Sequence, residues 1–448
     1  MSLTYFGTDG VRGVYGQAPL TLDFAYALGK AAVAVLGDHL LCGRDTRISG
    51  PALEAAFGAG VKAAGGTFGR LGIIPTPAVA LLARELGADA GVVISASHNP
   101  AEYNGIKFFD AHGYKLSEET LQTLEGALAS ELGTAAMADL GALEAQGRAV
   151  QAETNSDAVT LYIKHCRAGM PDLSGLHIAL DCANGAAALT SPPALEQLGA
   201  KVTAINTHIS GEDINLGAGS THMEGLQELV RRGDFDLGIA HDGDADRVLF
   251  CDSQGQLVDG DQVLAICGKY LKEQDQLEGN GLVGTVMSNL GLERFCEREK
   301  IAFLRTPVGD SNVLDALRKQ GYVLGGEQSG HTIFYGSAPG HNSTGDGLLT
   351  TLQLLRVMLA SGSSLAELAA QMPRYPQALV NVKVEDKTKS AQTLKASVRA
   401  AEAALAEAGG GRVLVRPSGT EPLLRIMVEA ESQDLAGQTA QGLASLLL

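Results

Sequence analysis

One loop of the sequence carries three carboxylates at alternate positions, Asp242, Asp244 and Asp246, directly after a short apolar run. Oxygen ligands spaced in this way in a tight turn can converge on one hard cation such as Mg²⁺ and leave coordination positions open for a phosphate oxygen. An EF-hand loop would need glycine at its sixth position and glutamate at its twelfth, where Arg247 and Ser253 stand. The loop therefore predicts a divalent-metal site of another kind, and a solvated acidic turn is the alternative.

A serine loop from Ser95 to Pro100 follows the apolar run Ala90 to Ile94. A hydroxyl at the end of a strand is well placed to act as a nucleophile, which makes Ser97, beside His98, a candidate. No G-x-S-x-G sequence surrounds this serine, so the nucleophile elbow of a hydrolase is not indicated. On these residues alone, a serine that only caps the turn remains an open alternative.

Two further loops carry groups that suit a sugar phosphate. The segment Arg416 to Pro422 is followed by Arg425, and two guanidinium groups, two hydroxyls and a glycine amide can together cradle a phosphate. A plain turn between two strands is the alternative there. The segment Gly326 to His331 contains Glu327 and Ser329, which can bind sugar hydroxyls, although an ordinary turn would look the same.

A glycine pattern at Gly279, Gly281 and Gly284 matches G-x-G-x-x-G. A dinucleotide site needs this pattern after a strand and at the start of a helix, whereas here it precedes the strand-like run Leu282 to Met287. The sequence also lacks a Walker motif and a C-x-x-C pair. These observations argue against a Rossmann cofactor, a P-loop ATP site and a zinc ribbon, and the scattered cysteines are expected to be reduced.

The composition indicates a globular protein, because 45% of its 448 residues are hydrophobic and 19% are charged. A net charge of −17 repels phosphate backbones, so no nucleic-acid partner is expected. A small anionic substrate would then need a local basic cluster, such as the C-terminal arginines. The N-terminus resembles no signal peptide and no apolar run reaches the roughly 20 residues of a membrane span, so we expect a cytoplasmic protein with no membrane partner.

The candidate loops follow predicted strands. Apolar runs at His177 to Leu180, Leu237 to Ala240 and Tyr322 to Leu324 are typical of buried strands. Leucines and alanines recur at helical spacing from Leu22 to Leu36, and Thr21 is a suitable N-cap. Strands that alternate with helices favour parallel α/β sheets, in which ligands bind beyond the carboxyl ends of strands.

Two stretches look like linkers, residues 130–156, which are rich in Ala, Gly and Glu, and Gln371 to Gln377, which contains two prolines. After the second linker, the pattern changes to that of a small α+β domain. The predicted domains are 1–152 with the serine loop, 153–255 with the acidic loop, 256–372 with the sugar-binding loop, and 373–448 with the phosphate cradle.

Seven segments, in sequence order and covering nearly the whole chain, resemble the α-D-phosphohexomutase superfamily. They are Phe6 to Gly13, Ser95 to Pro100 with Asn104 to Phe109, Asp242 to Arg247, Val308 to Asp310, Gly326 to His331, Thr344 to Gly347 and Arg416 to Pro422. The resemblance is strongest to the branch that interconverts glucosamine 6-phosphate and glucosamine 1-phosphate and so feeds amino-sugar nucleotide and cell-wall precursor synthesis. It implies three similar mixed α/β sandwich domains plus a smaller C-terminal α+β domain around a central cleft.

The resemblance also implies roles for individual residues. Ser97 would be the phosphoserine of an intramolecular phosphotransferase, an isomerase, and Mg²⁺ would be the cofactor. The implied catalytic residues are Ser97, His98, Lys107, Arg12, Arg247 and His331. The implied metal ligands are Ser97, Asp242, Asp244 and Asp246. The implied substrate-binding residues are Glu327, Ser329, Arg416, Ser418, Gly419, Thr420 and Arg425.

One position departs from the family pattern Asp-Gly-Asp-Gly-Asp-Arg, because Ala245 replaces the second glycine. Its methyl group restricts positive φ but leaves all three carboxylates in place. The open alternatives are a phosphomannomutase or phosphoglucomutase on the same scaffold, a phosphatase that uses Asp242 and Asp244, and a non-enzymatic sugar-phosphate sensor. The expected partner is a small hexosamine phosphate, and a homodimer is an assembly that the resemblance allows.

Overall fold

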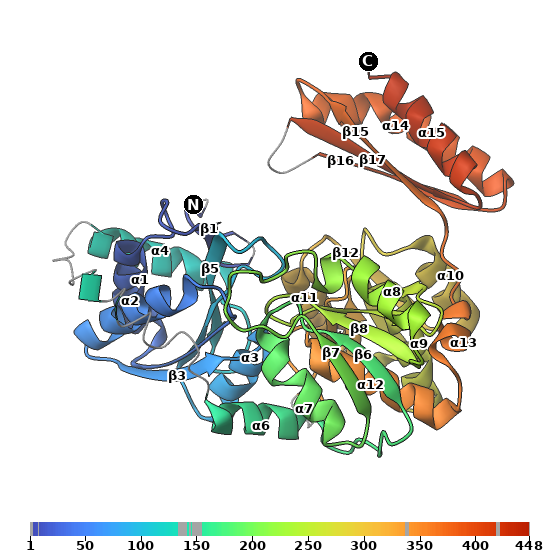
Figure 1. Ribbon diagram of the computed structural model, residues 1–448. Coiled ribbons are helices and arrows are strands. Elements are labelled where there is room, and N and C mark those ends of the chain that lie inside the picture. The colour runs from blue at the N-terminus through green and yellow to red at the C-terminus, as the bar shows by residue number, and fades with distance from the viewer. Residues whose placement is uncertain are drawn as a thin grey trace.

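The computed structural model describes residues 3–7, 9–132, 141–142, 145, 155–336, 340–417 and 422–447. Four sheets follow one another along the chain. Figure 1 shows the first three packed with their helices into one body, while the fourth stands apart from it. No helix within the described part of the chain is both long and apolar enough to cross a bilayer.

The first unit is a five-stranded sheet in the order β1-β5-β4-β2-β3. Its central strand β2 runs parallel to β3 and β4, whereas β5 is antiparallel to both β4 and β1. The strands are β1 (Val11–Val14), β2 (His39–Arg44), β3 (Thr67–Ile73), β4 (Ala90–Ile94) and β5 (Tyr103–Asp110). The helices are α1 (Leu22–Leu36), α2 (Gly50–Ala63), α3 (Thr76–Glu85) and α4 (Glu118–Leu132).

The second unit repeats this plan in the order β10-β9-β8-β6-β7. Strand β6 is parallel to β7 and β8, and β9 is antiparallel to β8 and β10. The strands are β6 (His177–Asp181), β7 (Lys201–Ile205), β8 (Leu237–His241), β9 (Val248–Asp252) and β10 (Leu257–Val258). The helices are α6 (Ser156–Cys166), α7 (Ser191–Glu196) and α8 (Glu224–Arg232), with short 3₁₀ turns at Ala186–Leu189 and Gly219–Thr221.

The third unit has the order β12-β11-β13-β14, again with a parallel centre and an antiparallel last strand. The strands are β11 (Gly281–Thr285), β12 (Ala302–Thr306), β13 (Leu324–Gly326) and β14 (Thr332–Phe334). The helices are α9 (Gly260–Glu273), α10 (Leu290–Glu299), α11 (Asp310–Gln320), α12 (Gly347–Ser361) and α13 (Leu365–Ala370), with a 3₁₀ turn at Glu278–Asn280.

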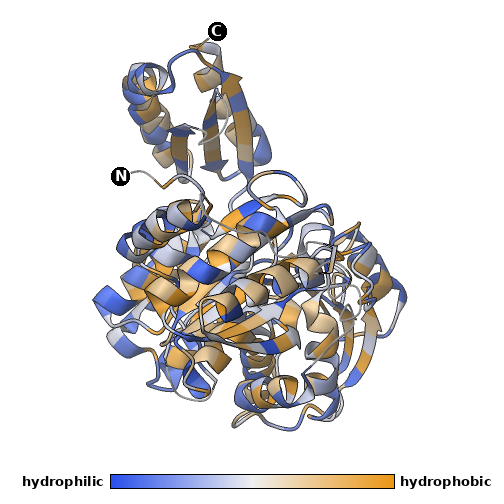
Figure 2. Ribbon diagram, turned by 90° about the vertical axis from the view of Figure 1, so that its left-hand side faces the viewer, coloured by the Kyte–Doolittle hydropathy of each residue, from blue (hydrophilic) through white to orange (hydrophobic). Residues whose placement is uncertain are grey.

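The fourth unit is an antiparallel sheet in the order β15-β17-β16. Its elements are β15 (Gln377–Lys383), α14 (Lys387–Glu407), β16 (Gly411–Pro417), β17 (Leu423–Ala430) and α15 (Gln433–Ser445). It has its own hydrophobic cluster, which includes Leu394, Leu424 and Ile426. In Figure 2 its strands are largely hydrophobic, which agrees with a core between the sheet and its helices.

A second cluster runs through the other units: helix α3 of the first unit packs in the same core as buried side chains of the second and third. Because this core crosses the unit boundaries, it fixes the first three sheets relative to one another. The expected N-cap of the first helix is also confirmed. Thr21 caps α1 by accepting a hydrogen bond from the amide of Phe24, as its position predicted.

Three loops occupy equivalent places in the three repeated sheets. Each joins a parallel strand to its antiparallel neighbour: β4 to β5, β8 to β9 and β13 to β14. These connections hold the serine loop, the acidic loop and the Glu327 loop respectively. The strands expected at Ala90 to Ile94, His177 to Leu180 and Leu237 to Ala240 are the parallel strands β4, β6 and β8. The strand expected at Tyr322 to Leu324 begins only at Leu324, as β13, and the local pattern did not predict the antiparallel strands. The repeated topology explains how segments more than 100 residues apart can reach one place.

Candidate active site

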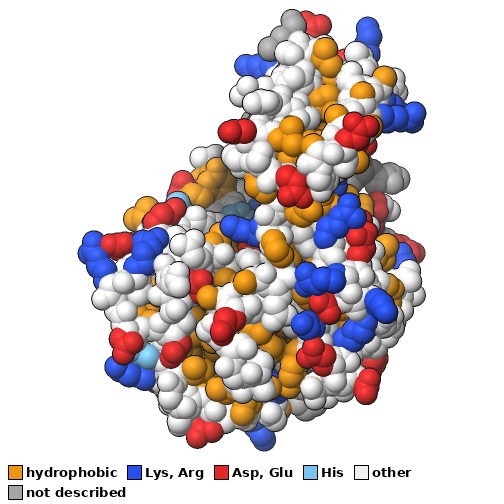
Figure 3. All heavy atoms as spheres, turned by 90° about the vertical axis from the view of Figure 1, so that its right-hand side faces the viewer, with side chains coloured by type: hydrophobic (Ala, Val, Ile, Leu, Met, Phe, Trp, Pro, Cys, Tyr) orange, Lys and Arg blue, Asp and Glu red, His pale blue; other side chains and the backbone are white. Residues whose placement is uncertain are grey.

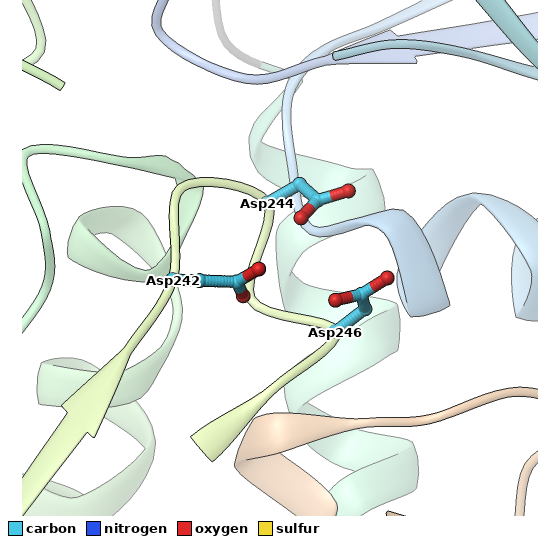
Figure 4. Close-up of side chains that lie close together, drawn as sticks. All are labelled: Asp242, Asp244 and Asp246. Carbon is cyan, nitrogen blue, oxygen red and sulfur yellow. The ribbon is translucent and has the colours of Figure 1, made fainter. Parts of the chain in front are cut away.

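The acidic loop between β8 and β9 brings three buried carboxylates together. Oxygen atoms of Asp242, Asp244 and Asp246 lie within 4.8 Å of one another, and Figure 4 shows the three side chains turned toward a common point. Oδ1 of Asp244 and Oδ1 of Asp246 are buried and have no hydrogen-bond partner among the described residues. Buried carboxylate oxygens left in this state fit a divalent cation, which prefers oxygen ligands.

The loop conformation depends on Ala245, whose φ is 55°. Most residues other than glycine avoid this left-handed region because Cβ approaches the following carbonyl oxygen. Ala245 adopts this conformation despite its methyl group, and the three carboxylates still converge. The methyl group itself is buried in the core shared by the units.

Ser97 follows β4 and is fully buried beside the acidic loop. Its hydroxyl donates to Oδ2 of Asp242 over 2.6 Å. Burial and the charges of Asp246 and Asp244 raise the pKa of Asp242 well above its ordinary value. Ser97 also has a positive φ of 53°, which turns its side chain toward the carboxylates in an uncommon backbone conformation.

His98 faces a guanidinium rather than the serine. A terminal nitrogen of Arg247 lies 2.6 Å from Nδ1 of His98 and can only donate, so Nδ1 accepts and the ring proton is on Nε2. The hydroxyl of Ser97 is farther from the same nitrogen, at 3.4 Å. Burial and the charges of Arg247 and Arg12 lower the pKa of His98 to about 4. His98 is therefore neutral at pH 7 and positions Arg247.

Lys107 on β5 is buried among carboxylates. Its Nζ lies 2.8 Å from Oδ2 of Asp244, 3.2 Å from Oδ2 of Asp9 and 3.9 Å from Oδ2 of Asp246. Burial alone would lower the pKa of Lys107, but Asp244 and Asp9 outweigh it and raise this pKa far above the usual range. Lys107 is therefore a permanent cation in this arrangement.

Six ionisable side chains form a ring in which anionic groups alternate with basic ones, and Asp244 is a further partner of Lys107 outside this ring. The ring joins the first three units, because its members come from the loop before β1, from β5 and the segment after it, from the acidic loop, and from the third unit. In order, the members are Lys107, Asp9, Lys115, Asp310, His331 and Asp246, and the contact between Asp246 and Lys107 closes the ring.

Three of these members were not among the expected site residues. Lys115 forms ion pairs with both Asp9 and Asp310, and Asp9 also pairs with Arg12. Asp9 and Asp310 stand within the recognised motifs, whereas nothing in the sequence around Lys115 indicated a role. The ring places Arg12 at the edge of the site through its contact with Asp9.

His331 lies between the acidic loop and Asp310. Its Nε2 accepts a hydrogen bond from the amide of Gly345 over 3.0 Å, which places the ring proton on Nδ1, 3.7 Å from Oδ2 of Asp246. Burial lowers the pKa of His331, but Asp246 and Asp310 outweigh it and raise this pKa. Although the pKa of His331 is raised, the hydrogen bond that the Gly345 amide donates to Nε2 favours the neutral form of the ring.

The remaining expected residues lie farther out. Oε1 of Glu327 accepts a hydrogen bond from the amide of Gly309 over 3.0 Å, and Ser329 is exposed. A cavity of about 970 Å³ reaches the site at Lys115 and Gly309 and continues along residues 110–121 and α11. Neither Ser97 nor any residue of the acidic loop is among the described residues that line this cavity.

The two C-terminal arginines are half-buried and lie opposite each other on adjacent strands of the fourth sheet. Arg416 on β16 pairs in register with Arg425 on β17. Like charges directly opposite each other destabilise a sheet unless an anion lies between them. Ser418, Gly419 and Thr420 lie outside the described residues. Figure 3 shows the surface hollowed where the fourth unit meets the body.

Comparison with known proteins identifies the family. Models for the four domains of phosphoglucomutase/phosphomannomutase match in order: domain I at 3–133, domain II at 161–255, domain III at 259–375 and the C-terminal domain at 379–446. The phosphoglucosamine mutase of Clostridium botulinum (strain Kyoto / Type A2) is 46% identical over 450 residues, covering 99% of this chain and 98% of its own. That of Carboxydothermus hydrogenoformans is 46% identical over 455 residues with the same coverage.

Solved structures show the same fold. A phosphoglucomutase/phosphomannomutase family protein from Burkholderia thailandensis is 25% identical with a TM-score of 0.78, covering 97% of this chain and 95% of its own. N-acetylphosphoglucosamine mutase of Aspergillus fumigatus, solved with GlcNAc-6P and magnesium, has a TM-score of 0.65 at 18% identity. The match covers 100% of this chain and 96% of the Aspergillus chain. The chain belongs to the phosphoglucomutase/phosphomannomutase family, and the relatives that match it at 46% identity over nearly its whole length are phosphoglucosamine mutases.

Proposed function

We propose that the protein interconverts glucosamine 6-phosphate and glucosamine 1-phosphate through a phosphoserine at Ser97. The observation that carries this proposal is the 2.6 Å hydrogen bond from the Ser97 hydroxyl to Asp242, within a buried carboxylate triad. The names of the curated relatives supply the substrate. The product would supply reactions that build amino-sugar nucleotides and cell-wall precursors.

The reaction keeps one phosphate on the enzyme at its start and end. In the first transfer, the bond between Ser97 Oγ and phosphorus breaks, a bond from phosphorus to the free sugar hydroxyl forms, and the hydroxyl proton passes to a base. The resulting bisphosphorylated sugar turns around in the cleft. The second transfer returns the other phosphate to Ser97 Oγ, and the oxygen that loses it takes up a proton.

Positive charge around Ser97 lowers the barrier, because the transition state spreads negative charge over the phosphoryl oxygens. Arg247, held by His98, and Lys107, held by Asp244, would bring such charge. Asp242, Asp244 and Asp246 would hold Mg²⁺ together with an oxygen on Ser97, and the bound ion would neutralise part of the same charge.

Proton transfer falls to His331 in this proposal. Lys107 is already a cation and cannot accept a proton, although it can donate a hydrogen bond when the phosphate leaves. His331 is neutral in the tautomer that the Gly345 amide favours, so it can take up a proton from a sugar hydroxyl at Nε2 once the hydrogen bond from that amide breaks.

The fourth unit would bind the phosphate that is not reacting. The opposed guanidinium groups of Arg416 and Arg425 gain from an anion placed between them. Ser418, Gly419 and Thr420 would contribute hydroxyl and amide donors, and Glu327 and Ser329 would hold sugar hydroxyls. A cytoplasmic location accords with six cysteines that are buried and free, and a homodimer rests on the family resemblance alone.

A phosphomannomutase or phosphoglucomutase is the second candidate, because the matched family models carry those names. A coupled assay with the 6-phosphates of glucosamine, glucose and mannose tests the choice. We expect the highest kcat/KM for glucosamine 6-phosphate. A higher value for glucose or mannose 6-phosphate would reassign the substrate, and binding without turnover of any sugar would indicate a sensor.

A further inference from the structure

Arg47, which was not among the expected site residues, binds the main chain of the serine loop. Arg47 follows β2, is fully buried, and uses all five of its N–H donors. One donor reaches Oδ2 of Asp45 at 2.9 Å, and the other four reach main-chain carbonyl oxygens of the serine loop and of the start of β5. These carbonyls belong to Ser97, Asn99, Pro100 and Tyr103.

The second unit reaches the same carbonyls. Nδ2 of Asn215 lies 2.9 Å from the oxygen of Ser97 and 3.1 Å from that of Asn99, so each of these oxygens accepts from both Arg47 and Asn215. Gly243 makes room for this contact, because a Cβ there would lie 2.7 Å from the Ser97 oxygen and 2.9 Å from Nδ2 of Asn215. The missing side chain at Gly243 therefore lets the acidic loop pack against the Ser97 carbonyl oxygen and the Asn215 amide.

The amide side of Ser97 is fixed as well. Its N–H donates to the hydroxyl of Ser95 over 2.9 Å, and Ser95 donates to Oδ2 of Asp45 over 2.6 Å, the oxygen that Arg47 also contacts. Both peptide groups of Ser97 are thus held, which stabilises its left-handed φ of 53°. Without these partners, a serine would relax toward a more common conformation and turn its hydroxyl away from Asp242.

We propose that Arg47 and Asn215 are positioning residues that fix the backbone of Ser97, so that its Oγ stays aimed at the acidic loop during both phosphoryl transfers. This proposal rests on the proposed phosphoserine function. Asn215 comes from the second unit, so the aim of the nucleophile also depends on how the first two units pack. Neither side chain contacts the Ser97 hydroxyl, and both act through its main chain.

Asn215→Gly tests the proposal with little backbone strain, because Asn215 has a φ of 60° that glycine adopts readily. Asn206→Gly is the matched control: Asn206 has a φ of 51° and donates to Asp181 instead of the serine loop. We expect the kcat of Asn215→Gly to fall about tenfold with little change in KM, since misaimed reacting groups lose rate rather than affinity. The control should keep the kcat of the unmodified protein.

Arg47→Lys supplies an independent variant, since an ammonium has three donors for five acceptors. We expect a kcat loss of about 100-fold. Arg44→Lys alters another fully buried arginine, which pairs with Glu54, and should retain activity if it folds. More bisphosphorylated sugar should escape per turnover in both Asn215→Gly and Arg47→Lys, a change that a general loss of stability would not produce.

The outcomes separate the two proposals. If Asn215→Gly keeps the kcat of the unmodified protein while Ser97→Ala is inactive, the positioning role is wrong and the phosphoserine function stands. If Asn206→Gly loses as much kcat as Asn215→Gly, the effect is a general one and the positioning role is again wrong. Turnover by Ser97→Ala would overturn the proposed function itself.

Discussion

Replacing Lys107 with methionine removes the cation that three carboxylates share. Lys107 is 2% exposed and its closest partner, Asp244, is buried, so the variant leaves Asp244 without its ammonium partner in a dry environment, whereas Asp9 keeps Lys115. Removing one member of a buried ion pair costs about 3–5 kcal/mol of unfolding free energy. Because the pKa of Lys107 is raised, its stabilisation is complete below the ordinary lysine pKa of about 10.4 and is lost only as the pH rises through the raised value. The loss in Lys107→Met should therefore be the same at pH 6 and pH 9.

Urea unfolding with and without Mg²⁺ measures this prediction. A divalent cation neutralises the same carboxylates, so Lys107→Met should gain more unfolding free energy from saturating Mg²⁺ than the unmodified protein does. Lys115→Met is the matched control, because Lys115 pairs with Asp9 and Asp310 but with no residue of the acidic loop. A loss below about 1 kcal/mol, typical of exposed pairs, would refute the reasoning, and so would an equal Mg²⁺ gain in the unmodified protein and Lys107→Met.

Three further predictions concern other parts of the molecule. Burial and the charge of Asp259 raise the pKa of Asp261 to about 8. Between about pH 4 and about pH 8 this carboxyl is therefore ionised in the unfolded chain but protonated in the folded one, so the free energy of unfolding falls by up to about 1.4 kcal/mol per pH unit. Asp261→Asn should therefore be the more stable protein at pH 8.5 but not at pH 4 in urea unfolding, and equal pH dependence of the two would contradict this. Asp244→Asn should greatly weaken Mg²⁺ binding in calorimetry, and full activity in excess chelator would show that the acidic loop binds no required metal. Arg416→Ala or Arg425→Ala should each cost roughly 1.5–3 kcal/mol in kcat/KM, partly as turnover, with Ser97 phosphorylation preserved, whereas unchanged steady-state kinetics would place the phosphate site elsewhere.

Much of the fold could be predicted because strong local signals coincide with buried elements. The apolar run Ala90 to Ile94 is β4 with the same bounds, and the strand expected at Leu237 to Ala240 is β8. The antiparallel edge strands β1 and β14 escaped prediction. They are only four and three residues long, and pairing with a neighbouring strand defines them. The domain boundaries at 152, 255 and 372 stay predictions.

The site was predictable where a motif carries several polar groups within a few residues, as at Asp242 to Asp246. Arg47, Asn215 and Lys115 were missed for a physical reason. The contacts of Arg47 and Asn215 with Ser97 span 50 and 118 residues, and Lys115 acquires its role by pairing with the distant Asp9 and Asp310. No local pattern records such contacts, because the packing of the units creates them.

The phosphate on Ser97 gives the most direct test of the phosphoserine mechanism. Mass spectrometry of the peptide that contains Ser97, before and after addition of glucosamine 6-phosphate, follows this phosphate through one turnover. The mechanism predicts phosphate on Ser97 in part of the purified protein, its removal by the sugar as a bisphosphate appears, and neither phosphate nor turnover in Ser97→Ala. Turnover by Ser97→Ala, or a phosphate that the sugar removes from another residue, would contradict it.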